Sequence, residues 1–191
     1  MSSAAERDTE VGRTALPTSV RVWDPLVRVF HWSLVAAFCV AWVTGGESEG
    51  VHTVMGYAIL GLVAVRVVWG IIGTRHARFA DFIYSPATVV AFLKDTMALR
   101  ARRYVGHNPA GGVMVVLLLL GLVAITATGI MMTTDAFWGI DWVRHAHSLT
   151  VDLTLLLIVA HLGGVALASW EHGENLVKAM WTGRKRGEET E

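Results

Sequence analysis

Two histidines, His147 and His161, lie fourteen residues apart in one long, mostly apolar stretch of the sequence. In an α-helix, fourteen residues rise about 21 Å, close to four turns, so both imidazoles point to the same side, roughly 40° apart. Ionisable side chains at membrane depth are costly and are usually functional. The spacing therefore predicts a membrane-spanning helix with one inward imidazole near each face of the bilayer.

The hydrophobic residues, 53% of the 191, are gathered into four runs. A spanning helix needs about 20 mainly apolar residues. Four runs meet this length: about Leu26 to Thr44, His52 to Ile72, Gly111 to Met132 and Ser148 to Trp170. The predicted fold class is therefore an all-α membrane protein, a bundle of four transmembrane helices.

The loop charges predict the orientation of the bundle. Arginine and lysine gather between the second and third spans and after the fourth, whereas Arg144 is the only one in the two opposite connections. Because positive loops stay inside, both termini and the long loop are expected in the cytoplasm. We predict a flexible cytoplasmic tail at 1–19, the helical domain at 20–183 and a polar cytoplasmic tail at 184–191. The formal net charge of zero gives no indication of nucleic-acid binding.

The long loop contains a further helix signal. Ser85 followed by Pro86 is typical of a helix start, and an apolar stripe with Lys94 and Asp95 beside it follows: Val89, Val90, Leu93 and Met97. This pattern predicts a short amphipathic helix on the inner membrane surface. The alternative is a packing helix of a small cytosolic subdomain.

Depth in the membrane pairs the histidines. His31 lies near the inner end of the first span and His161 in the inner half of the fourth, whereas His52 and His147 lie at the outer ends of the second and fourth. The sequence therefore predicts an inner pair, His31 with His161, and an outer pair, His52 with His147. His145 is the weaker outer candidate, because sixteen residues from His161 turn it about 160° away.

Two sites of two imidazoles each favour haem over other metals. Zinc and copper usually take three or four protein ligands, whereas a porphyrin brings four nitrogens and needs two axial ligands. The single cysteine, Cys39, excludes a disulfide or an iron–sulfur cluster within the chain. Gly56 and the pair Gly163–Gly164 would let a flat ring approach the backbone, although glycines also serve helix packing. A lone histidine in a membrane helix can also be a hydrogen-bonded packing residue.

Arg66 lies fourteen residues after His52 and therefore on the same side of its helix. Its depth places it in the inner half of the bundle. A guanidinium there could pair with a haem propionate or orient a quinone headgroup, so Arg66 is a candidate cofactor-binding residue. The alternative is that its side chain extends to the inner surface.

Several motifs together resemble the bacterial cytochrome b561 family, which includes the di-haem cytochrome b subunit of nickel–iron hydrogenases. The resemblance covers about residues 20–186. It is carried by Val22-Trp23-Asp24-Pro25 through Phe30-His31-Trp32, by His52, Gly56 and Arg66, by Gly106-His107-Asn108-Pro109, and by His147 with His161. It implies four core helices, two haem b groups with His31, His52, His147 and His161 as axial ligands, and electron exchange with quinone.

Three functions remain open from the sequence. The first is an electron-transfer subunit between the quinone pool and a periplasmic c-type cytochrome, dehydrogenase or hydrogenase subunit in a respiratory chain, with no catalytic residue of its own. The second is a stand-alone superoxide oxidase that reduces quinone, which the short outer loops favour. The third is a non-haem membrane carrier, against which the lack of repeats or broken helices argues. The third span has no ligand, so its free face could pack on a second copy of the chain.

Overall fold

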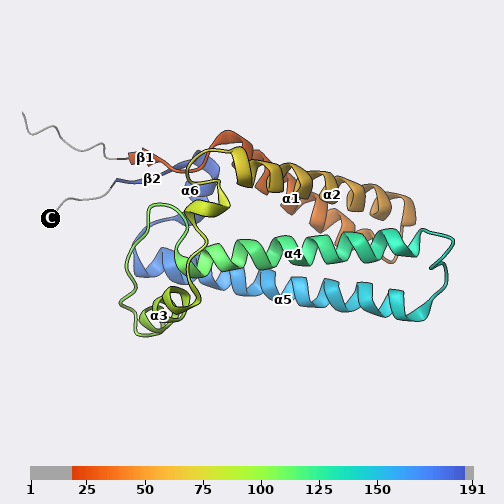
Figure 1. The fold of residues 1–191 in the computed structure, drawn as a ribbon. Coiled ribbons are helices and arrows are strands. Elements are labelled where there is room, and N and C mark those ends of the chain that lie inside the picture. Colours follow the sequence, from red (N-terminus) through yellow and green to blue (C-terminus); the bar gives the residue numbers. More distant parts are fainter. Residues whose placement is uncertain (1–18, 188–191) are drawn as a thin grey trace, which may run out of the picture.

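The computed structural model describes residues 19–187, and within them four helices are long and apolar enough to cross a membrane. They are α1 (Pro25–Thr44), α2 (Glu49–Ile72), α4 (Pro109–Met132) and α5 (Asp141–Glu171), and they form one elongated bundle (Figure 1). The predicted all-α membrane fold is confirmed. The predicted tail at 1–19 lies outside the described residues, except for Ser19.

Local capping explains where two of the long helices begin. Asp24 accepts a hydrogen bond from the backbone N–H of Val27 at 2.9 Å, and Asn108 accepts one from Gly111 at 2.7 Å. In each case a proline follows at the first helical position, where its missing N–H costs nothing. These caps begin α1 and α4 slightly before the apolar runs.

α5 begins at Asp141, whereas the hydrophobic run predicted a start near Ser148. The extra turns carry polar residues, so hydropathy does not reveal them. An acidic residue in the first turn is favourable there, because it interacts with the positive end of the helix dipole. His147 consequently lies inside regular helix rather than at its end.

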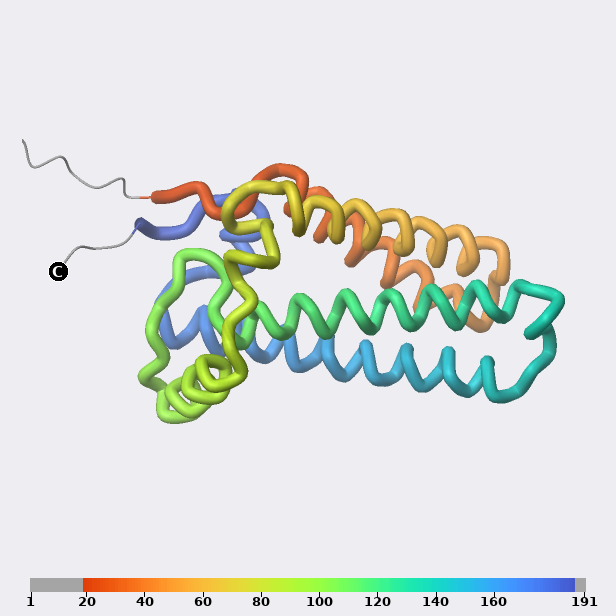
Figure 2. Tube along the Cα trace, viewed as in Figure 1, coloured from red at the N-terminus to blue at the C-terminus, as the bar shows by residue number. Residues whose placement is uncertain are grey.

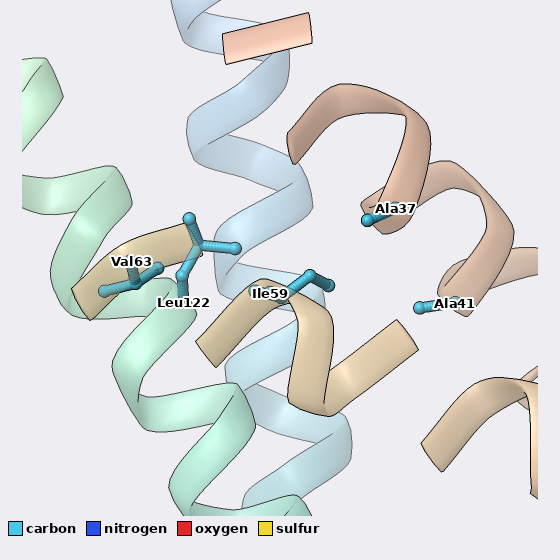
Figure 3. Packing of buried hydrophobic residues seen from close by; sticks show 5 residues of the cluster. All are labelled: Ala37, Ala41, Ile59, Val63 and Leu122. Atoms are coloured by element: carbon cyan, nitrogen blue, oxygen red, sulfur yellow. The ribbon is translucent and has the colours of Figure 1, made fainter. Parts of the chain in front are cut away.

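The four helices form two hairpins, α1 with α2 and α4 with α5, that meet along α2 and α4 (Figure 2). A buried apolar cluster fills this region: Ala37, Ala41, Ile59, Val63 and Leu122 (Figure 3). In the described residues, no extended packing joins α1 to α5. Many large apolar side chains face outward, among them Ile72 at 70% and Leu156 at 65% exposure. Such a surface suits lipid rather than water.

Smaller elements cover one end of the bundle. They are β1 (Ser19–Arg21), the 3₁₀ turn η1 (Phe79–Asp81), α3 (Pro86–Met97), α6 (Leu176–Thr182) and β2 (Arg184–Arg186). β1 pairs antiparallel with β2, with Val20 opposite Lys185. Both ends of the described chain therefore lie at the same end of the bundle (Figure 1).

A buried ionic cluster fixes this strand pair. The Lys185 ammonium donates to the Tyr104 carbonyl at 2.8 Å and lies 3.5 Å from the Glu174 carboxylate. The Arg103 guanidinium lies 3.1 Å from the same carboxylate. The sequence predicts a polar tail from 184 onward, whereas residues 184–186 form a strand with Lys185 only 7% exposed. The difference arises because these partners lie far away in the sequence.

The amphipathic helix predicted in the loop is confirmed as α3. Its Ser85 cap accepts a hydrogen bond from the Thr88 N–H at 3.2 Å. Phe92 is buried and packs edge-on against Tyr104, with 5.7 Å between the ring centres. The stripe residues Leu93 and Met97 are 45% and 86% exposed, as a helix resting on a membrane surface requires.

Candidate cofactor site

The structure brings His52 and His147 together at the end of the bundle opposite the strands. His52 lies in the first turn of α2 and His147 in the second turn of α5. Their ring centres are 6.1 Å apart, and the ring planes are nearly perpendicular at 80°. His145, in contrast, lies on the exposed side of α5. The outer imidazole that faces His52 is therefore that of His147.

Neighbouring helices orient both imidazoles. His52 Nδ1 donates to the Ala41 carbonyl on α1 at 2.8 Å, because a carbonyl can only accept. His147 Nδ1 lies 3.0 Å from the Thr128 hydroxyl on α4, which itself donates to the Ala124 carbonyl at 2.7 Å and so accepts from the histidine. Both Nε2 atoms therefore keep their lone pairs. Hydrogen bonding at one ring nitrogen commonly prepares the other for a metal.

This geometry fits an iron with two axial imidazoles. An iron about 2 Å from each Nε2, with each ring centre about 1 Å further on, needs ring centres roughly 6 Å apart. The observed 6.1 Å meets that requirement. No group of three or more histidine, cysteine, aspartate or glutamate side chains suited to a metal occurs in the described residues. A porphyrin, which needs only two protein ligands, fits this donor set better than a bare metal ion.

Thr128 and Gly129 are site residues that the sequence analysis missed. A Cβ at Gly129 would lie 3.3 Å from His147 Cε1, so the glycine makes room for the ring. A threonine beside a glycine in an otherwise apolar span was the available signal. The predicted glycines behave differently, because a Cβ at Gly56, Gly163 or Gly164 would meet no atom within 4 Å. Close helix packing therefore does not explain those three.

The inner histidines are less closely associated. The His31 ring packs edge-on against Trp32, with 5.1 Å between ring centres, and its Nδ1 is buried without a hydrogen-bond partner. His161 is half-buried on α5. His161 is near enough to His31 for their charges to interact, but no ring contact like that of the outer pair is present between them in the described residues. The inner pair therefore stays a prediction.

Arg66 lies inside the protein, only 3% exposed, and does not extend to the surface. Its guanidinium carbon lies 5.1 Å from the centre of the Phe79 ring and 6.0 Å from that of Phe82. Its Nη1 is buried and has no hydrogen-bond partner. Among the described residues, no carboxylate lies within ion-pair distance of it.

His107 is a half-buried polar residue near Arg66, and the sequence marks it only as part of the motif Gly106-His107-Asn108-Pro109. Its ring lies 4.4 Å from that of Phe82 and 4.7 Å from that of Trp23, and its Nδ1 has no hydrogen-bond partner. Burial, followed by the positive charge of Arg66, lowers the pKa of His107 to about 3. The imidazole is therefore neutral at physiological pH.

Together, the four apolar helices and the facing imidazoles define a class of protein: a multi-pass membrane protein whose bundle suits axially ligated haem. The chain belongs to the prokaryotic cytochrome b561 family, which it matches over residues 22–183. Similar proteins include the probable Ni/Fe-hydrogenase B-type cytochrome subunit of Azotobacter vinelandii, 23% identical over 73% of this chain and 71% of that protein. The protein of the same name from Rhodobacter capsulatus is 24% identical over 88% of this chain and 82% of its own length. No solved structure matches the chain.

This family membership gives the coarse function. The chain is a membrane cytochrome that carries electrons with haem b. The resemblance expected from the sequence is thereby confirmed.

Proposed function

We propose that this chain is a di-haem cytochrome b that transfers electrons between a periplasmic redox partner and the quinone pool of a bacterial inner membrane. The observation that carries the proposal is the facing of His52 and His147, 6.1 Å apart, with both Nε2 atoms free. The fourteen-residue spacing from His147 to His161 supports a second haem site near the other face of the membrane.

The proposed roles follow the two levels. His52 and His147 hold the outer haem, His31 and His161 hold the inner haem, and Arg66 contributes to cofactor binding at the inner level. Bound haem b supplies an iron that gains and loses one electron. If two imidazoles held each iron, no coordination site would be left open for oxygen, and electron transfer would be favoured over oxygen activation.

The relatives' names suggest one partner, a hydrogenase subunit. A periplasmic c-type cytochrome or another dehydrogenase subunit would suit the same outer level. The positively charged loop lies at the same end of the bundle as residues 19–21 and 184–186, which supports a cytoplasmic position for that end (Figure 1). A second copy of the chain could pack on the outward face of α4, where Leu120 is 59% exposed.

The test compares His147→Ala with His145→Ala in the purified protein. We expect the wild type and His145→Ala to bind two haems per chain, and His147→Ala to lose one. Haem content is measured from the absorption of the extracted haem against protein concentration. A colourless wild type, or His147→Ala with both haems, would contradict the proposal.

A second candidate is a stand-alone superoxide oxidase that passes the electron of superoxide to quinone. The short outer connections, 45–48 and 133–140, favour it because they offer little surface to a large partner. Purified protein that reduces quinone with superoxide in the absence of another subunit would support this candidate. Reduction only in the presence of a redox partner would favour the first proposal.

A further inference from the structure

We propose that Arg66 and His107 form a binding site for a carboxylate, the propionate of the inner haem. The inference rests on the proposed function and adds residues to the inner level that are not axial ligands. It is carried by the buried guanidinium of Arg66 and the half-buried imidazole of His107, each of which has one buried nitrogen without a hydrogen-bond partner in the described residues.

The first argument is the unpaired charge of Arg66. A cation removed from water loses its hydration and needs an opposite charge close by. Arg66 is 3% exposed, and its guanidinium lies over the faces of Phe79 and Phe82. Aromatic faces attract a cation but carry no net charge. The site is therefore incomplete without an anion.

Among residues 19–187, no carboxylate forms an ion pair with Arg66. The charge of Asp24 acts on Arg66 from a greater distance, but both Asp24 oxygens are already engaged. Asp24 Oδ1 accepts from the Val27 N–H at 2.9 Å, and Oδ2 accepts from Trp69 Nε1 at 3.0 Å and from the Thr74 hydroxyl at 2.5 Å. These bonds direct the carboxylate to the start of α1 and the end of α2.

The depth of Arg66 along the bundle indicates which anion would bind beside its guanidinium. His52 and His147 face one another, so they fix the register between α2 and α5. Both helices run from this end towards the strands, and Arg66 and His161 each lie fourteen residues further on. The backbone of Arg66 is therefore at the level of His161, about 21 Å along the helix from the outer pair. A haem held by His161 would have carboxylates within reach of that level.

His107 supplies the second polar group. Its ring is held between Trp23 and Phe82, and Phe82 also lies under the Arg66 guanidinium. The unpartnered Nδ1 of a neutral imidazole can donate one hydrogen bond to a carboxylate oxygen. A quinone carbonyl could accept the same bonds, but it would leave the charge of Arg66 uncompensated.

The experiment is a redox titration of both haems at several pH values in wild type, Arg66→Met and Arg66→Lys. Removal of a positive charge disfavours the reduced, less positive iron, so Arg66→Met should lower the inner-haem midpoint potential and leave the outer one unchanged. The difference should shrink at acidic pH, as the unpaired propionate takes up a proton. Arg66→Lys, which keeps the charge, should stay close to wild type.

The control is Arg78→Gln, which removes a half-exposed charge paired with Asp81 at the same end. It should leave both potentials unchanged. The inference would be overturned if Arg66→Met bound two haems and both kept their wild-type potentials at every pH. A raised KM for quinone in the same variant would then assign Arg66 to quinone binding. A wild type that binds fewer than two haems would instead contradict the proposed function itself. Arg66→Met should fold, since it removes a buried, unpaired charge.

Discussion

His52 and His147 depend on polar groups of other helices for their orientation. The Ala41 carbonyl and the Thr128 hydroxyl each bind one Nδ1, and a histidine ring without such a bond would turn more freely. The Thr128 oxygen can accept this bond because its own hydroxyl proton is donated to the Ala124 carbonyl. The tautomer of each imidazole is therefore set outside the helix that carries it.

This arrangement predicts the effect of Thr128→Val, which replaces the hydroxyl by a methyl group of similar size. The His147 Nδ1–H then loses its acceptor, and outer-haem affinity should fall about 10-fold or more. The measurement is haem loss to a competing haem-binding protein. Thr126→Val is the matched control, because the Thr126 hydroxyl bonds only to carbonyls of its own helix. Equal haem loss in both variants would contradict the role of Thr128.

At the scale of the element, α4 carries no predicted ligand but packs against α2, α3 and α5. Its glycines lie where other segments approach closely. A Cβ at Gly112 would lie 2.2 Å from the Phe82 carbonyl oxygen, and Phe82 supports both Arg66 and His107. The start of α4 therefore positions the loop that carries Phe82, beside Arg66 and His107.

Gly112→Ala should consequently destabilise the protein. The new methyl group meets backbone, which cannot rotate away as a side chain can, and overpacking of this kind costs about 1–3 kcal/mol. Gly61→Ala is the control, since a Cβ there would meet no atom within 4 Å. Thermal unfolding in detergent should show a lower midpoint for Gly112→Ala only. A lowered midpoint for both variants would contradict the prediction, because the loss would then not depend on the contact with Phe82.

At the scale of the whole molecule, β1 and β2 join the two ends of the described chain, and Glu174 lies at the centre of this connection. Its carboxylate binds Arg103 at 3.1 Å and accepts from the Arg186 N–H at 2.8 Å. Although burial raises the pKa of Glu174, these partners outweigh it and hold that pKa below its usual value of 4.5. The ionised form therefore stabilises the folded end of the bundle.

The lowered pKa predicts a pH-dependent effect of Glu174→Gln. A carboxylate with a lowered folded-state pKa contributes stability that is fully present above its usual value and is lost as the pH falls through the folded-state value. The variant should therefore unfold at a lower temperature than wild type at pH 7, and the difference should vanish well below pH 4.5. Asp95→Asn, which breaks an exposed pair with Arg100, is the control and should have little effect. A pH-independent difference would contradict the assigned ionisation.

The sequence predicted the four spans and the helix of the long loop, because long apolar runs and the Ser85-Pro86 start are local signals. α1 and α4 begin at Pro25 and Pro109, slightly before the predicted spans. It also placed Arg66 on the inward side of α2 from spacing alone. It did not predict the roles of Thr128 and His107 or the pairing of residues 19–21 with 184–186. Those features depend on contacts between segments far apart in the chain, which no local pattern contains.

By itself, the sequence determined that four helices are long and apolar enough to cross a membrane, and which side of the first, second and fourth carries the histidines. It could do so because lipid requires every backbone group to be bonded within a helix, and the helical repeat then fixes each side chain's direction. Only the tertiary structure decided that the Ala41 carbonyl and the Thr128 hydroxyl hold the two outer imidazoles, and that Arg66 is buried with no ion-pair partner among the described residues. Both outcomes depend on how the two hairpins pack along α2 and α4.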